Sequence, residues 1–556
     1  MTRELRGVPA APGAAVGAPW IHRPAGTAGG AARLSLDEAA EAASAEISEL
    51  AARLRARGHE TEAEILDAQG LMAGDPELID PARELVEAGS SPADAIHEAG
   101  ERVARTFEAL DDEILSARAS DVRDVAARIM RLMSGEPPPR LERRSVVVAL
   151  DLPPSVTVEL DPELLAGIAL EGGSRTSHAA ILSRSLGIPA VVGVAGLRDA
   201  AGSAAALGLD GDGGVVVVDP DADARARLAM AADAAGERAR GDAAFGDLPL
   251  ATSDGHRVIC AANIGDPVEA SGAFAAGAEA IGLFRTEFAF AGRGTPPDEG
   301  TQARAYATVL RAAGDADVVV RLVDIGGDKP LPFLAIEPEA NPFLGVRAIR
   351  LHERHPDLLP TQVRAILRAS LEAGRRASIM APMVADEADL DLVLRLVDEA
   401  CTAVPDAPAP RVGIMVEVPS AVLLADRLAP RVEFMSIGTN DLTQYLLAAD
   451  RSNAALAARQ DPLHPAVLRA VSRVVEAAER AGACEVAVCG EMAGDPVGAQ
   501  LLVGLGVDEL SMEPRAFGGV KRAVAARTRT ELGALAVAAR GMASPAAVRA
   551  SMEAAT

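Results

Sequence analysis

Lysine is nearly absent from this chain of 556 residues, which contains only Lys329 and Lys521. Almost all of its positive charge is therefore arginine, a compositional bias that says nothing about function. Basic side chains number 54 against 80 acidic ones, which gives a formal net charge of -26. That balance disfavours a polyanionic partner such as nucleic acid and suits the docking of a basic protein surface.

Cysteine is scarce as well, and Cys260, Cys401, Cys484 and Cys489 are spread along the sequence without a CxxC pair. This spacing argues against both a disulfide framework and a structural zinc site. Long apolar runs are also missing: the opening MTRELRGVPAAPGAAVG lacks an apolar signal core, and no stretch of about 18 uncharged apolar residues occurs. We therefore expect a soluble, cytoplasmic protein without a membrane partner.

The chain is too long for one ordinary hydrophobic core, so several domains are expected. The first long segment, residues 24–144, is predicted to be helical. Within it, Ser35 and Glu38 form a capping box at the start of a helix that Gly58 ends. A further helical segment, broken or continuous, runs to Gly135.

After residue 144 the pattern changes to β-branched runs separated by turns, at Val146 to Leu150, Ala190 to Val192 and Val215 to Val218. These runs predict an α/β unit. An Ala- and Arg-rich stretch from about residue 221 to 240 follows, and it predicts a linker helix.

Eight short apolar runs recur beyond Asp254, each followed by a polar loop and an amphipathic segment, and this pattern predicts a (β/α)8 barrel. The runs are RVICAANI, AIGLFRTEF, VVVRLVDIGG, SIMAPMV, RVGIMVEV, FMSIGTN, EVAVCGE and DELSM. Polar side chains cluster at the carboxyl ends of these runs, which in a barrel converge on one mouth where catalytic sites lie. They are Arg285, Glu287, Asp324, Asp328, Glu417, Asn440, Asp441, Cys489 and Glu491.

His178 lies in the glycine-led, hydroxyl-flanked run GGSRTSHAAILSRSLG. An imidazole that accepts a phosphoryl group must be exposed, held in one tautomer and surrounded by donors that tolerate negative charge. Arg175, Thr176 and Ser177 supply such donors, and the following segment is predicted to be a helix whose N-terminus favours an anion. A lone histidine is more often structural, but this context favours a phosphoryl carrier.

Glu417 and Asp441 end adjacent predicted strands, where two hard carboxylates can hold Mg²⁺ and leave positions for substrate oxygens. Solvated loop acids are the alternative. Arg285, Arg321 and Arg451 fall near the same mouth and would bind a small phosphate-bearing carboxylic acid through bidentate contacts. Buried ion pairs compete with that hypothesis, and their acidic members would be Glu287, Asp324 and Asp450. The arginines that could join either arrangement are Arg347, Arg364 and Arg368.

Cys489, in VAVCGEMAGD, also ends a predicted strand. A thiol with an ordinary pKa of about 8.5 can deliver a proton to an enolate carbon near neutral pH. An isolated cysteine is more often a small buried packing residue, but the position at the barrel mouth favours a proton donor. Cys484 lies upstream of the strand end and is assigned to packing.

These motifs together resemble Enzyme I of the bacterial sugar phosphotransferase system, the phosphoenolpyruvate-protein phosphotransferase family, over essentially the whole chain. The matching segments are GVPAAPGAAVG, LDDEILSARASDVRD, the His178 run, IGLFRTEF, RLVDIGGDK, NPFLGVRAIR, VRAILRAS, IMVEVPSA, FMSIGTNDLTQY and CGEMAGD. The resemblance implies that His178 takes the phosphoryl group of phosphoenolpyruvate and passes it to a histidine of the carrier protein HPr. Pyruvate is released, as the first step of sugar uptake.

The resemblance also implies a role for each residue at the barrel mouth. Substrate binding falls to Arg285, Arg321, Asn440 and Arg451, Mg²⁺ binding to Glu417 and Asp441, and protonation of the enolate to Cys489. The implied domains are a swivelling phosphohistidine α/β domain (1–23 and 145–220), a helical HPr-binding insertion (24–144), a linker helix (221–252) and a phosphoenolpyruvate-binding TIM barrel (253–556). The barrel would also form a homodimer.

Two other interpretations compete with this one. A nucleotide-dependent relative such as phosphoenolpyruvate synthase or pyruvate phosphate dikinase would share the phosphohistidine and barrel parts, but it needs an ATP-binding domain. The residues before the phosphohistidine unit contain no phosphate-cradling glycine-rich loop. An inactive scaffold would be expected to lack at least one chemical residue, yet the whole set is present.

Overall fold

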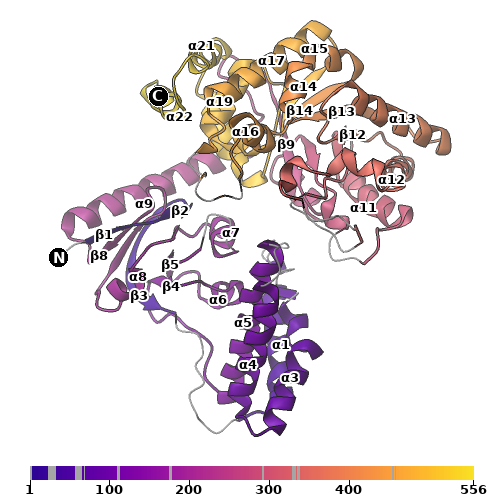
Figure 1. Cartoon of the computed structure of the whole chain (residues 1–556). Coiled ribbons are helices and arrows are strands. Elements are labelled where there is room, and N and C mark those ends of the chain that lie inside the picture. Colours follow the sequence, from indigo (N-terminus) through magenta and orange to yellow (C-terminus); the bar gives the residue numbers. More distant parts are fainter. Residues whose placement is uncertain are drawn as a thin grey trace. The chain divides into compact units, whose positions relative to one another are not determined.

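The structure is a computed structural model that describes residues 3–22, 33–56, 66–67, 69–108, 113–173, 178–290, 294–327, 333–334, 339–451, 453, 456 and 459–555. The chain divides into two compact units, Met1–Glu237 and Arg238–Thr556, whose elements are labelled in Figure 1. Among the described residues, no helix is long and apolar enough to cross a membrane.

Unit 1 contains a group of helices packed around an apolar core, as predicted. They lie side by side in Figure 1 and comprise α1 (Leu36–Ala56), α3 (Pro76–Glu87), α4 (Pro92–Glu108) and α5 (Glu113–Ser134). The predicted capping box at the start of α1 is confirmed: the Ser35 backbone N–H donates to Glu38 Oε2 at 2.9 Å, and the Glu38 N–H donates to Ser35 Oγ at 3.3 Å. Gly58, the predicted end of this helix, lies outside the described residues.

The same unit contains a mixed sheet, which confirms the predicted α/β unit. Its order, within the described part of the chain, is β1-β8-β7-β3-β4-β5-β6-β2. The central strands β3 (Ala14–Ile21), β4 (Ser145–Ala149), β5 (Leu165–Leu170) and β6 (Ala190–Val192) are parallel. The flanking strands β1 (Arg3–Arg6), β2 (Val8–Ala11), β7 (Leu207–Asp210) and β8 (Val215–Val218) pair antiparallel. Every residue of β4 and β5 is buried, as expected for parallel strands covered on both faces.

Three short helices connect these strands: α6 (Pro154–Glu159), α7 (His178–Ser185) and α8 (Leu197–Ala201). The helix predicted to follow the glycine-led run is therefore present and begins at His178 itself. Arg175, Thr176 and Ser177 lie outside the described residues. A long helix, α9 (Ala222–Ala243), covers the stretch predicted to be a linker helix.

Unit 2 is the predicted barrel. Eight parallel strands close on themselves in the described residues, in the order β9 to β16. They are β9 (Ile259–Ile264), β10 (Ala280–Phe284), β11 (Val318–Arg321), β12 (Ser378–Ala381), β13 (Arg411–Val416), β14 (Phe434–Ile437), β15 (Glu485–Val488) and β16 (Glu509–Met512). Each corresponds to one of the eight predicted runs. The domain boundaries themselves, at 23, 144, 220 and 252, stay predictions.

Helices follow the barrel strands in sequence, as amphipathic segments that bury one face. The longer ones are α11 (Glu299–Ala312), α12 (Leu358–Ala373), α13 (Glu387–Ala403), α16 (Thr439–Leu447), α17 (Pro465–Ala481), α19 (Pro496–Leu505), α20 (Phe517–Ala525), α21 (Arg529–Ala539) and α22 (Pro545–Ala554). Inside the barrel, the buried side chains of Leu283, Val319, Met380, Met415, Phe434 and Cys489 form a separate apolar cluster. One candidate catalytic residue is thus part of the barrel core.

A buried ionic cluster connects α5 of unit 1 to α6. Arg128 forms ion pairs with Glu46 at 2.8 Å and Glu159 at 3.0 Å, and its guanidinium donates to Ser155 Oγ at 3.1 Å. Ser155 Oγ in turn donates to Asp124 Oδ2 at 2.6 Å. Burial raises the pKa of Asp124 to about 6, although Ser155 and Arg128 oppose the rise.

Replacement of this carboxylate is expected to stabilise the protein in a pH-dependent way. A carboxyl whose folded-state pKa is raised from 3.8 to about 6 favours folding at low pH, and the contribution is lost as the pH rises through about 6. Asp124→Asn keeps an acceptor for Ser155 and carries no charge. Its free energy of unfolding should exceed that of the wild type by about 1–3 kcal/mol at pH 8 and match it near pH 4. Urea unfolding at both pH values would measure this, and equal stability at pH 8 would contradict it.

Candidate active site

The candidate residues of unit 2 lie where barrel strands end, except Arg451, which follows α16 (Thr439–Leu447). Arg321 is the last residue of β11, and Arg285, Glu417 and Cys489 directly follow β10, β13 and β15. Asn440 and Asp441 lie in the first turn of α16, just after β14. Because all strands are parallel in a closed barrel, these carboxyl ends lie at one mouth.

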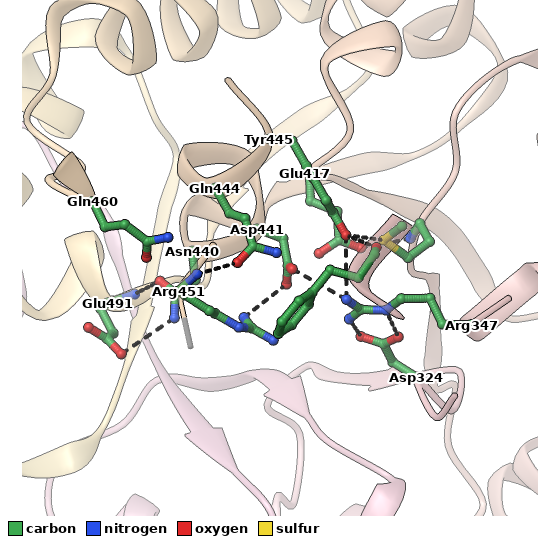
Figure 2. A network of polar contacts seen from close by, with 12 residues as sticks. Asp324, Arg347, Glu417, Asn440, Asp441, Gln444, Tyr445, Arg451, Gln460 and Glu491 are labelled. Atoms are coloured by element: carbon green, nitrogen blue, oxygen red, sulfur yellow. Dashed lines mark hydrogen bonds and ion pairs between the residues drawn. The ribbon is translucent and has the colours of Figure 1, made fainter. Parts of the chain in front are cut away.

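Ion pairs connect several loops at this mouth (Figure 2). Asp324 accepts hydrogen bonds from Arg347 Nε at 2.9 Å and Nη2 at 2.6 Å, and both side chains are only 1% exposed. Arg347 Nη1 lies 3.4 Å from Asp441 Oδ1, and Arg451 Nη1 lies 3.4 Å from Asp441 Oδ2. The Arg451 guanidinium also lies 4.9 Å from the centre of the Phe343 ring. Asp441 is therefore held between two arginines.

Arg321 is largely engaged by acidic partners. Its Nη2 donates to Glu287 Oε1 at 2.7 Å, and its Nη1 lies 3.6 Å from Asp324 Oδ2. The Asp324 backbone N–H donates to the same Glu287 oxygen at 2.8 Å. The ion-pair hypothesis thus holds for Arg321, but its Nε is buried without a hydrogen-bond partner in the described structure.

Asn440 forms a separate connection across the mouth, to Glu491. Its Oδ1 accepts from the Glu491 backbone N–H at 2.9 Å, and its Nδ2 lies 3.5 Å from Glu491 Oε1. Figure 2 shows this pair on the same side of the network as Arg451. The bond ties the start of α16 to α18 (Glu491–Gly494), which follows β15.

Glu417 is a fully buried carboxylate. Its Oε1 accepts a hydrogen bond of 2.7 Å from the Met383 backbone N–H, and Met383 adopts a left-handed conformation with φ of 58°. Burial, together with the negative charges of Asp441 and Asp324, raises the pKa of Glu417 to about 8, although Arg321 and Arg347 oppose the rise. The positive charges of Arg321 and Arg347 do not offset the cost of burying a negative charge on Glu417.

Glu417 and Asp441 fit a divalent cation. A Cβ added to Gly438 would lie 3.0 Å from Glu417 Oε2, so this oxygen lies against the start of the helix that contains Asp441. Within the described residues, Oε2 accepts no hydrogen bond, and a cation would relieve the raised pKa. No group of three or more His, Cys, Asp or Glu suited to a metal occurs among those residues. Mg²⁺, however, commonly uses one or two carboxylates together with water and substrate phosphate.

The Cys489 thiol is buried in the barrel interior, 3% exposed. Burial raises its pKa to about 11, while the Ser436 hydroxyl and the charges of Arg321 and Arg285 lower it in part. Its Sγ lies 3.8 Å from the Ile437 carbonyl oxygen. The thiol is therefore protonated at neutral pH, which suits a proton donor and not a nucleophile.

The eight candidate site residues are divided between the two units. His178 belongs to unit 1, and the remaining seven belong to unit 2. Arg347 joins the mouth, whereas Arg364 and Arg368 form ion pairs with Glu299 at the start of α11. Asp328 lies outside the described residues. The assigned roles of all these residues stay predictions.

Sequence reasoning missed two contributors to the geometry of the mouth: the Met383 backbone, which holds Glu417, and the Phe343 ring, which holds Arg451. Neither residue ends a strand, and a left-handed methionine has no sequence signature. NPFLGVRAIR, which contains Phe343 and Arg347, was the only signal for this loop.

Three family descriptions match the chain in order. "PEP-utilising enzyme, N-terminal" matches residues 6–118, "PEP-utilising enzyme, mobile domain" matches 141–221, and "PEP-utilising enzyme, PEP-binding domain" matches 239–529. The last of these alone covers more than half of the chain.

Curated proteins are similar over most of the chain. The phosphoenolpyruvate-protein phosphotransferase of Haloferax volcanii is 41% identical over 504 residues, 88% of this chain and 86% of that protein. The protein of the same name from Bacillus subtilis is 40% identical over 461 residues, 81% and 80% of the two chains. A multiphosphoryl transfer protein of Rhodobacter capsulatus is 43% identical over 453 residues, 80% of this chain and 54% of that protein. The chain thus spans about half the length of this last relative.

The burial and protonation of Cys489 can be tested without substrate. Iodoacetamide at pH 8 should alkylate the partly exposed Cys401 at least about 10²-fold faster than Cys489, because the reaction requires a thiolate and access to it. Time-resolved peptide mass spectrometry would measure both rates, and in denaturant they should become similar. Rapid modification of Cys489 in the folded protein would mean that the thiol is neither buried nor protonated.

Proposed function

The chain belongs to the phosphoenolpyruvate-protein phosphotransferase family, and from that premise we propose that it moves the phosphoryl group of phosphoenolpyruvate to its own His178. The group then passes to a histidine of the phosphocarrier protein HPr, as the first step of sugar uptake. The observation that carries the proposal is the convergence of paired arginines, two carboxylates and a protonated thiol at one barrel mouth.

Phosphoenolpyruvate carries a phosphate and a carboxylate, and both suit guanidinium donors. We assign them to Arg285, Arg321 and Arg451, with Asn440 assisting. The buried Arg321 Nε–H without a partner supports an anionic ligand at that point, since an unsatisfied buried donor costs about 1–3 kcal/mol. The guanidinium of Arg451 lies over the Phe343 ring, and this contact holds it at the same mouth.

Glu417 and Asp441 would hold a divalent metal, which we take to be Mg²⁺. When bound, the metal would neutralise charge on the phosphoryl oxygens. The raised pKa of Glu417 and its Oε2, which accepts no hydrogen bond from the described residues, support this assignment. Asp441 can serve as a ligand while Arg347 and Arg451 keep its side chain in place.

In the chemical step, an imidazole nitrogen of His178 forms a bond to phosphorus as the bond from phosphorus to the enolate oxygen breaks. The Cys489 thiol then gives its proton to the methylene carbon of the enolate, and pyruvate results. The guanidinium groups bind the phosphate and carboxylate while water is excluded from the mouth. The acceptor of the second step is the carrier's histidine, and docking of a basic carrier surface suits a chain with a net charge of -26. A homodimer formed through the barrel and a cytoplasmic location belong to the same proposal.

Replacement of the phosphoryl carrier should abolish both transfers. His178→Ala is expected to take no acid-labile label from labelled phosphoenolpyruvate and Mg²⁺ in the absence of nucleotide, and to pass none to HPr. His97→Ala, which removes an exposed histidine from the same unit, should be labelled like the wild type. Persistent acid-labile label on His178→Ala would refute the assignment, and a wild type that takes no label would refute the function.

Replacement of the proton donor should separate the two half-reactions. Cys489→Ala is expected to slow pyruvate formation by about 10²-fold or more, the usual contribution of a positioned general acid. Transfer from phosphorylated HPr back to His178 does not involve the enolate and should keep its wild-type rate. Cys484→Ala is the matched control, and an equal loss of both half-reactions in Cys489→Ala would contradict the specific role.

A further inference from the structure

A single buried amide connects the ends of β10 and β11. The side chain of Gln362, in α12, is completely buried. Its Nε2 donates to Thr286 Oγ1 at 2.9 Å and to Tyr306 Oη at 3.0 Å, and its Oε1 accepts from the Val323 backbone N–H at 2.9 Å. Both donor hydrogens of the amide are therefore used within the protein core.

The orientation of this amide is fixed by the hydroxyl hydrogens around it. Thr286 Oγ1 donates its hydrogen to the Arg321 backbone carbonyl at 2.9 Å. Tyr306 Oη donates its hydrogen to Gln302 Oε1 at 3.0 Å. A hydroxyl has only one hydrogen, so both oxygens can only accept from Gln362. The network thus requires a side chain at position 362 that donates two hydrogen bonds.

This network holds the backbone of Arg321 from the side of the protein core. Thr286 binds the Arg321 carbonyl, and Gln362 binds the N–H two residues further along the chain. From the other side, Glu287 accepts from the Arg321 guanidinium and from the Asp324 backbone. The network therefore holds the backbone at Arg321, and Glu287 holds its guanidinium, while the buried Nε has no hydrogen-bond partner among the described residues.

We propose that Gln362 is a positioning residue for phosphoryl transfer, one that orients Arg321 toward the phosphate of phosphoenolpyruvate without touching the substrate. The inference rests on the proposed function. Arg321 keeps its charge when Gln362 is replaced, so the substrate still binds. What is lost is the fixed direction of the guanidinium, and such misplacement by about 1 Å can cost about 10² in rate.

Gln362→Met keeps the length of the side chain and removes its amide. Its kcat for pyruvate formation should fall by about 10²-fold, with a change in KM for phosphoenolpyruvate of less than about threefold. Phosphoryl transfer between HPr and His178 should keep its rate. The matched control is Gln500→Met, which removes a buried glutamine of α19 that donates to the Ala523 carbonyl at 2.6 Å. It should leave kcat unchanged.

Gln362→Glu supplies a second test that a purely structural role would not pass. An ionised glutamate donates no hydrogen bond, but a protonated one donates one, so its kcat relative to the wild type should rise as the pH falls. Wild-type kcat in Gln362→Met, or a pH-independent ratio in Gln362→Glu, would overturn the positioning role alone. No pyruvate from the wild type would overturn the proposed function together with it.

Discussion

The geometry of the barrel mouth depends on the buried ion pair between Asp324 and Arg347. Two parallel hydrogen bonds join the side chains, and neither is reached by solvent. Loss of one partner from such a pair costs about 3–5 kcal/mol, because the other charge is left buried and alone. Since Arg347 also reaches Asp441, the loop after β11, the loop before α12 and the first turn of α16 are fixed against one another.

The same pair leaves little positive charge at the mouth to offset Glu417. Arg347 is already shared between Asp324 and Asp441, and Arg321 is engaged by Glu287. Burial, with the charges of Asp441 and Asp324, therefore raises the pKa of Glu417 although Arg321 and Arg347 lie near it. An anionic substrate would add further negative charge to this site. Under the proposed function, a divalent ion held by the Glu417 and Asp441 carboxylates would offset this negative charge.

The sequence predicted the placement of the candidate residues well where these residues follow strand ends. Glu417, Asp441 and Cys489 follow periodic apolar runs, and closure of a parallel barrel brings such positions together whatever the detailed packing. Arg347 and Gln362 lie away from strand ends, and Met383, just after β12, acts through its backbone; their partners are set by loop conformation and by the packing of α12. No periodic pattern encodes those contacts. The raised pKa of Cys489 could not be predicted from the sequence either, because it depends on side chains from several strands.

Burial of Cys489 has two consequences that work together under the proposed function. A thiol with a pKa of about 11 is a weaker acid than an exposed one, but it is also fully protonated at neutral pH and ready to donate. The apolar cluster around it excludes water, which would otherwise compete as a proton source. After proton transfer, the positive charges of Arg285 and Arg321 favour the thiolate, since both lower the pKa of Cys489. The arginines assigned to the substrate therefore also stabilise the conjugate base of the acid that completes the reaction.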